Sequence, residues 1–245
     1  MDQYPVDQTL LTEADSGVRP TTQFLAIHTS EGALTIESLL AWCADKNRGA
    51  SYNTMIDRQG RTGRCNDDQY APWAAGWTGN ARGWHVCLLG FAAQSRGEWL
   101  SYTGQLDRLA DMLAFYCRKY QIPAVWLTAA DVRAGKRGIC GHAEISEAWR
   151  EVNHTDPGPN FPKDVLIAKV AAKLAPQPTA PKQGGSDMDA LTAAEQRELL
   201  VKTREIWEQL RGPGGRGWEQ LGKTSDGHNL TLVDSLARHT AGGSK

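Results

Sequence analysis

The residues best suited to chemistry are His142 and the segment His154–Gly158, which reads HTDPG. Imidazole and carboxylate groups, with one histidine coming from far along the chain, are typical of zinc sites in enzymes, where three protein ligands leave a fourth position open for water. Gly141 gives His142 conformational room, and the Pro-Gly pair fixes the turn after Asp156. The spacing alone also fits a plainer interpretation, in which each histidine is a satisfied polar residue and Asp156 is a turn residue.

Each candidate needs an element that positions it. Phe24–Ile27 is a short apolar run that predicts a buried strand, and the exit of this strand delivers His28 to a surface. Residues 35–46 have apolar side chains at helical spacing, with Thr35 as the cap. Residues 52–57 alternate in pattern and residues 58–61 supply a turn into a second short strand, which predicts a hairpin.

The middle of the chain continues the mixture of strands and helices. Residues 86–91 are apolar enough for a central strand. Residues 103–120 place their apolar side chains on one face, which predicts an amphipathic helix closed by Pro123. Together these elements predict an α/β fold with a central mixed sheet flanked by helices.

A change of composition divides the chain. Residues 175–190 are rich in Pro and Gly without apolar periodicity, which predicts a linker between a catalytic domain, residues 1–174, and a small helical C-terminal region, residues 191–245. Within that region, residues 191–211 predict one helix with an apolar stripe among charged neighbours. The region is too short for a deep core of its own, so it needs a partner, a second copy or the main domain.

Composition excludes several classes of function. The formal net charge of −1 is unlike that of polyanion binders, so we expect no nucleic-acid partner. We also expect no membrane insertion and no signal peptide, because no run of about 18 apolar residues exists and the first residues lack a basic and then apolar pattern. The five cysteines are odd in number and form no C-x-x-C pair, so we expect reduced, structural thiols.

Three of the nine tryptophans, Trp73, Trp77 and Trp84, cluster in a Gly-rich stretch. One interpretation is a loop pinned by aromatic packing, and the other is a platform for sugar or peptide. We carry the three as candidate substrate-binding residues.

Four motifs in order resemble the type-2 N-acetylmuramoyl-L-alanine amidase family, which includes phage endolysins and animal peptidoglycan recognition proteins. The resemblance covers about residues 20–170. The motifs are an apolar strand ending in histidine, a Ser/Gly-Tyr strand leading to a charged turn, a Gly-His loop, and a closing Asp or Cys before Pro-Gly. They match Phe24–His28, Ser51–Gly60, Gly141–His142 and His154–Gly158.

The resemblance implies a role for five residues. His28, His142 and Asp156 take the positions of Zn²⁺ ligands, Tyr52 that of a catalytic tyrosine in the phage branch, and His154 that of a catalytic lysine in many members. Zinc lowers the pKa of bound water to about 7 and polarises the amide carbonyl. Tyr52 and His154 would then stabilise the oxyanion or protonate the leaving amine.

Two departures from the family pattern stand out. Some members place a glutamate base on the strand corresponding to residues 85–90, where this chain has Cys87. A His-Ala-Gly sequence of many relatives is replaced by residues 74–76, which read AAG. His85 either approaches the groove or packs against Trp84, and the sequence leaves both interpretations open.

The segment after residue 191 resembles the C-terminal region of endolysins from phages of mycobacteria and related actinobacteria. The resemblance therefore implies a phage endolysin that cuts the N-acetylmuramoyl-L-alanine bond of bacterial peptidoglycan for host cell lysis, and that stays in the host cytoplasm until a holin opens the membrane. Two alternatives are a non-catalytic peptidoglycan-binding recognition module and a zinc peptidase cutting within the stem peptide. For the C-terminal region we favour self-association, giving a homo-oligomer, over cell-wall binding.

Overall fold

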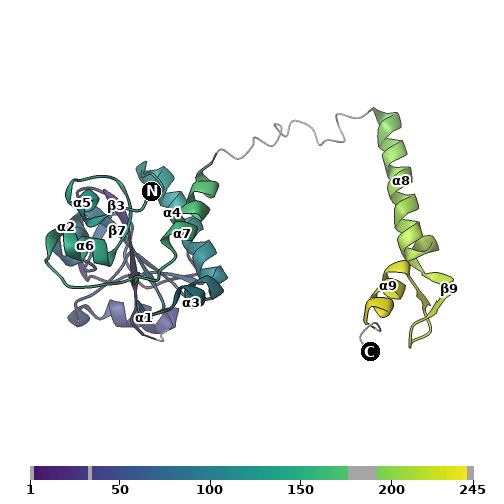
Figure 1. Ribbon diagram of the computed structural model, residues 1–245, viewed down its shortest axis with the longest axis horizontal. Helices are drawn as coiled ribbons and strands as arrows, with labels where there is room; N and C mark the ends of the chain where they lie inside the picture. Colours follow the sequence, from purple (N-terminus) through teal and green to yellow (C-terminus); the bar gives the residue numbers. More distant parts are fainter. Residues whose placement is uncertain (1–2, 33–34, 176–191, 242–245) are drawn as a thin grey trace. The chain divides into compact units, whose positions relative to one another are not determined.

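The computed structural model describes residues 3–32, 35–175 and 192–241 (Figure 1). The predicted linker, residues 175–190, lies outside the described residues apart from its first residue. The chain divides into two compact units, Met1–Pro178 and Thr179–Lys245.

The first unit is built on a six-stranded sheet with the order β1-β5-β4-β7-β3-β8. Its strands are β1 (Gln8–Thr9), β3 (Phe24–Thr29), β4 (Thr54–Ile56), β5 (Thr62–Arg64), β7 (Gly83–Leu88) and β8 (Gly138–Gly141). Strands β4, β7, β3 and β8 run parallel, whereas β5 is antiparallel to β4 and parallel to β1. A separate antiparallel pair joins β2 (Asp15–Val18) to β6 (Tyr70–Pro72). The predicted mixed sheet and the predicted hairpin, formed by β4 and β5, are both confirmed.

Helices cover both faces of this sheet (Figure 1). They are α1 (Ile36–Ala44), α2 (Gly76–Arg82), α3 (Arg96–Ser101), α4 (Thr103–Tyr120), α5 (Ala129–Arg133), α6 (His142–Trp149) and α7 (Lys163–Leu174), with a short 3₁₀ turn η1 (Lys46–Arg48). The predicted amphipathic helix matches α4, and the predicted first helix matches α1, which Thr35 caps by accepting from the Ser38 backbone N–H. Among the described residues, no helix combines the length and apolarity needed to cross a membrane.

Alternation along the central strands decides which side chains face which helices. On one face, Leu25 and Ile27 of β3 and Trp84 of β7 are fully buried in a core with α4 and α7. On the other face, Phe24 and Ala26 pack with α5 and α6. Because side chains alternate, every second residue of β3 and β7 is directed away from α4 and toward the face where the chemistry lies.

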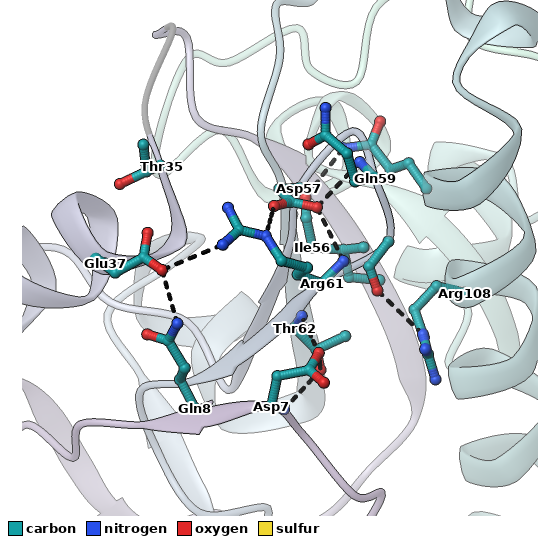
Figure 2. Close-up of polar contacts among 12 residues, drawn as sticks. Asp7, Gln8, Thr35, Glu37, Ile56, Asp57, Gln59, Arg61, Thr62 and Arg108 are labelled. Atoms are coloured by element: carbon teal, nitrogen blue, oxygen red, sulfur yellow. Dashed lines mark hydrogen bonds and ion pairs between the residues drawn. The ribbon is translucent and has the colours of Figure 1, made fainter.

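The N-terminal segment is fastened to the sheet by polar contacts (Figure 2). The Asp7 carboxylate accepts from the backbone N–H and the hydroxyl of Thr62, at 2.7 and 2.8 Å. Next to it, the Gln8 side chain donates to Glu37 of α1 at 2.7 Å, and this bond, together with further hydrogen bonds and the charge of Arg61, lowers the pKa of Glu37 to about 2. Strand β1 is thereby tied to both β5 and α1.

The second unit begins with the predicted helix, α8 (Ala193–Arg211), which ends at the 3₁₀ turn η2 (Pro213–Gly215). It continues as a two-stranded antiparallel sheet, β9 (Trp218–Lys223) with β10 (Asn229–Leu230), and closes with α9 (Leu232–Ala241). The strands were not expected in a helical region. Their sequence favours them locally, because an Asp-Gly pair, residues 226–227, lies in the connecting turn.

Candidate metal centre and active-site cleft

Two neighbouring parallel strands bring distant histidines together. His28 lies near the carboxyl end of β3, and His142 is the first residue of α6, directly after β8. The register pairs Ile27 with Gly141, so the two histidines follow paired positions at the same edge of the sheet. Asp156 reaches this edge from the loop between α6 and α7.

The three predicted ligands converge on one point. His28 Nδ1 lies 3.1 Å from His142 Nδ1 and 3.3 Å from Asp156 Oδ2, and His142 Nδ1 lies 3.2 Å from Asp156 Oδ1. All three side chains are buried, and their donor atoms lie within 4.8 Å of one another. Two imidazole nitrogens and one carboxylate oxygen form a donor set that suits Zn²⁺ and leaves a fourth position for water. The residues present therefore fit the metal that the resemblance implies.

The Asp156 loop is held against the sheet from two sides. The backbone N–H of Thr29 donates to Asp156 Oδ2 at 3.1 Å, and that of Ala143 donates to the Asp156 carbonyl at 3.0 Å. Gly141 permits this approach, since a Cβ there would lie 2.5 Å from Pro157 Cδ. The glycine before His142 thus makes room for the loop that carries the third ligand.

Electrostatics leave Asp156 and His142 in states that can bind a metal. Burial opposes ionisation of Asp156, but hydrogen bonds and charge from His142 and His28 outweigh it and hold the Asp156 pKa well below its usual range. Burial lowers the pKa of His142, although the hydrogen bond and charge of Asp156 act to raise it. An ionised carboxylate and a neutral imidazole are the forms that coordinate metal ions.

His154 covers this group of residues from the solvent side. Its ring stacks on His142 with centroids 4.3 Å apart and an interplanar angle of 12°, and its Nδ1 lies 3.9 Å from Asp156 Oδ1. Its backbone N–H donates to Ser146 Oγ at 3.1 Å, which fixes the loop. The side chain is 58% exposed, so it can contact a bound molecule as well as the buried histidine.

Tyr52 lies on another side of the same group. Its ring centroid is 5.3 Å from that of His28, and its side chain is partly buried. Burial, with further contributions from Cys87 and Cys43, raises the Tyr52 pKa well above its usual value. The hydroxyl therefore keeps its proton at neutral pH and can act as a hydrogen-bond donor.

A cleft of about 790 Å³ opens onto these residues, and Tyr52, His142, His154 and Asp156 all line it. Trp73 and Trp77 also line the cleft, and Trp77 is 76% exposed. Both therefore remain candidates for contact with a substrate.

The assignment of Trp84 as a substrate-binding residue is wrong. Trp84 is fully buried on the α4 face of β7, where its indole packs 4.0 Å from the Tyr116 ring and its Nε1 donates to Asp68 at 3.1 Å. Strand β7 begins at Gly83, earlier than predicted, so alternation directs Trp84 into the core.

Neither interpretation of His85 is correct. It lies on β7 facing away from the core that holds Trp84, is fully buried, and is not among the residues that line the cleft. Its ring instead contacts His28. Cys87, next to His28 in the strand register, is buried and free like the other four cysteines, as expected for structural thiols.

Among the cleft residues that were not predicted, Trp42 and Glu31 offer an aromatic ring and a carboxylate. Trp42 lines the cleft from the exposed side of α1, opposite the apolar face that identified the helix. Glu31 also lines it, with a φ of 50° that is unusual for a residue other than glycine, and its carboxylate accepts from Thr29 Oγ1 and from the Ala92 backbone N–H. A carboxylate three residues after a ligand histidine was the available signal.

Comparisons with known proteins agree with this geometry. Residues 18–159 match a family model described as N-acetylmuramoyl-L-alanine amidase, and residues 191–242 match one described as the Rv3766 C-terminal domain. A protein of Mycobacterium tuberculosis, named uncharacterized protein Rv3766, is 53% identical over 68 residues. That match covers 26% of this chain and 25% of the relative, so it spans about a quarter of the relative's length.

Solved structures show the same fold. The hydrolase AmiA of Staphylococcus aureus in complex with its ligand has a TM-score of 0.56 at 15% identity, covering 72% of this chain and 90% of that one. A mutant of PlyL has a TM-score of 0.50 at 12% identity, covering 69% of this chain and 99% of that one. Because the amidase model matches more than half of the 245 residues, the chain belongs to the N-acetylmuramoyl-L-alanine amidase family.

Proposed function

We propose that this chain hydrolyses the amide bond between N-acetylmuramic acid and L-alanine in bacterial peptidoglycan, using Zn²⁺ held by His28, His142 and Asp156. The observation that carries the proposal is the convergence of these three buried side chains beside the cleft. The family assignment supports the class of bond.

Zn²⁺ bound at these residues would polarise the scissile carbonyl and lower the pKa of water. The protein supplies the remaining chemistry. Tyr52 keeps its proton, so its hydroxyl donates to the substrate oxygen as negative charge develops there. His154 lies at the exposed side of the site, where an imidazole can pass a proton to the departing alanine nitrogen. Without that proton the amine is a poor leaving group.

The biological setting is a further part of the proposal. We propose an endolysin of a phage or prophage, held in the host cytoplasm until a holin opens the membrane. The matched C-terminal domain and the Mycobacterium tuberculosis relative make mycobacterial peptidoglycan the first substrate to test. Through α8, the second unit would join two copies of the chain or bind the wall.

Digestion of purified mycobacterial peptidoglycan tests the reaction. The expected products carry new amino-terminal L-alanine without new reducing sugar ends, and they disappear with the Asp156→Ala variant. New termini between amino acids of the stem peptide would identify a zinc peptidase instead. Binding to peptidoglycan without any product, in protein loaded with zinc, would identify a recognition module.

A further inference from the structure

A third buried histidine extends the candidate metal centre into the protein. His85 Nδ1 lies 2.9 Å from His28 Nε2, and His85 Nε2 lies 3.3 Å from the Gly79 carbonyl oxygen of α2. The His28 and His85 ring centroids are 5.2 Å apart. His85 is fully buried and does not line the cleft, so its role concerns His28 rather than the substrate.

The Gly79 carbonyl, at the end of this chain of hydrogen bonds, determines which ring nitrogens carry protons. A backbone carbonyl only accepts, so His85 Nε2 carries the proton, and in a neutral imidazole Nδ1 then accepts. His28 Nε2 must therefore donate to His85. In the neutral His28 imidazole the other nitrogen, Nδ1, then has the free lone pair that a metal ion needs, and Nδ1 is the atom that lies beside Asp156 Oδ2, at 3.3 Å.

Neighbouring residues define the position of the His85 ring. In the parallel register His85 pairs with Ala26, two residues before His28, so the two histidines lie on the same face of the sheet. Gly83 leaves space for the ring, because a Cβ there would lie 2.6 Å from His85 Nε2. The backbone N–H of His85 donates to Asn53 Oδ1 at 2.9 Å, which anchors the strand at this point.

We propose that His85 is a positioning residue, which holds His28 in the tautomer whose Nδ1 is free to bind Zn²⁺. The inference depends on the proposed zinc site and adds a residue outside its ligand set. Hydrogen-bond partners of metal-binding histidines fix the ring orientation, and their loss typically weakens metal affinity by about 10- to 100-fold.

Two substitutions distinguish the effect of the His28–His85 hydrogen bond from the effect of the volume that the His85 ring fills. His85→Phe keeps an aromatic ring but removes the acceptor, whereas His85→Asn retains an acceptor oxygen close to the position of Nδ1. Zinc affinity of the full chain is measured by competition with a chromophoric chelator. We expect His85→Phe to bind zinc about 10- to 100-fold more weakly than the wild type, and His85→Asn to recover most of the loss.

Trp84→Phe is the matched control, because it alters a buried ring on the same strand but on the opposite face of the sheet. It removes the Nε1 group that donates to Asp68 and should lower the melting temperature without changing zinc affinity. A loss of affinity caused by general destabilisation would appear in this variant as well.

The tautomer itself is observed in the zinc-loaded wild type by long-range ¹H–¹⁵N correlation of the histidine rings, which requires no variant to fold. We expect the proton of His28 on Nε2. A proton on Nδ1, or a folded His85→Phe variant with wild-type zinc affinity, would overturn the inference. If the wild type bound no zinc at all, the proposed function would fail instead, so the two failures are distinguishable.

Discussion

The ring of His154 stacks on that of His142, with a separation of 4.3 Å and 12° between the planes. One of these imidazoles is buried among the candidate ligands, and the other is more than half exposed at the cleft. The pair therefore joins the inner part of the site, which suits a metal, to the outer part, which suits a substrate. The same stacking also orients the exposed ring before any substrate arrives.

Substitution of His154 should affect turnover rather than metal content. We expect His154→Ala to lower kcat by about 10²-fold, the lower end of the range for general acid catalysis, with zinc content unchanged. His154→Lys should restore part of the rate, because an ammonium group can also donate a proton. Rates are measured on soluble peptidoglycan fragments, and zinc by elemental analysis. Loss of zinc along with activity would show that His154 is a ligand.

Tyr52→Phe removes one hydroxyl close to His28. If that hydroxyl donates to developing negative charge, kcat should fall by about 10²- to 10³-fold while KM stays nearly constant. Steady-state kinetics on the same fragments give both constants. Tyr102→Phe, outside the residues that line the cleft, is the matched control. Equal kcat in wild type and Tyr52→Phe would remove Tyr52 from the mechanism.

Metal removal should lower stability as well as activity. A ligand that binds only the folded state stabilises it by about 2.7 kcal/mol when present at 100 times its dissociation constant. We therefore expect chelation to lower the melting temperature and added zinc to restore it. The variants His28→Ala, His142→Ala and Asp156→Ala should each lose the zinc-dependent increment. A variant that kept both zinc and full activity would disprove its assignment as a ligand.

The candidate ligands were predictable because four motifs in order, among them His28 after an apolar run and His142 after Gly141, resemble those of the amidase family, whereas spacing alone left their role open. The residues around the candidate ligands were harder to predict from the sequence. Trp84 and His85 were assigned to a loop, but pairing of Phe24 with Gly83 extends β7 over them. Where a strand begins depends on its neighbours in the sheet. Because side chains alternate along a strand, a shift of one residue moves a side chain from the core face of the sheet to the face that carries the site. Trp42 was missed for a related reason, since the face that identifies a helix is its buried one.

Trp77 offers the most exposed ring of the cleft. If it contacts sugar or peptide, Trp77→Ala should raise KM by about fivefold, corresponding to loss of about 1 kcal/mol of aromatic contact, with kcat little changed. Kinetics on peptidoglycan fragments of increasing length would show which part of the substrate it contacts. An unchanged KM for every length would leave Trp77 as a loop residue only.

The apolar stripe of α8 predicts self-association. Leu199, Ile206, Trp207 and Leu210 are each between 41% and 59% exposed in the described second unit. We expect the full chain to form a dimer in analytical ultracentrifugation and Ile206→Glu to shift it to a monomer. Gln209→Glu adds the same charge outside the stripe and should leave the dimer intact. A wild type that stays monomeric at high concentration would favour wall binding, measured by co-sedimentation with peptidoglycan.

The pairing of β3 with β8 has a consequence for folding. It joins segments more than a hundred residues apart in the chain, and His28 and His142 become neighbours only when that contact closes. Contacts of such long range form late, because the entropy lost in closing a large loop must be offset by the rest of the sheet. A chain still emerging from the ribosome, or one that has lost β8, therefore has no complete set of candidate ligands, and metal binding at these residues would report that β3 and β8 have paired.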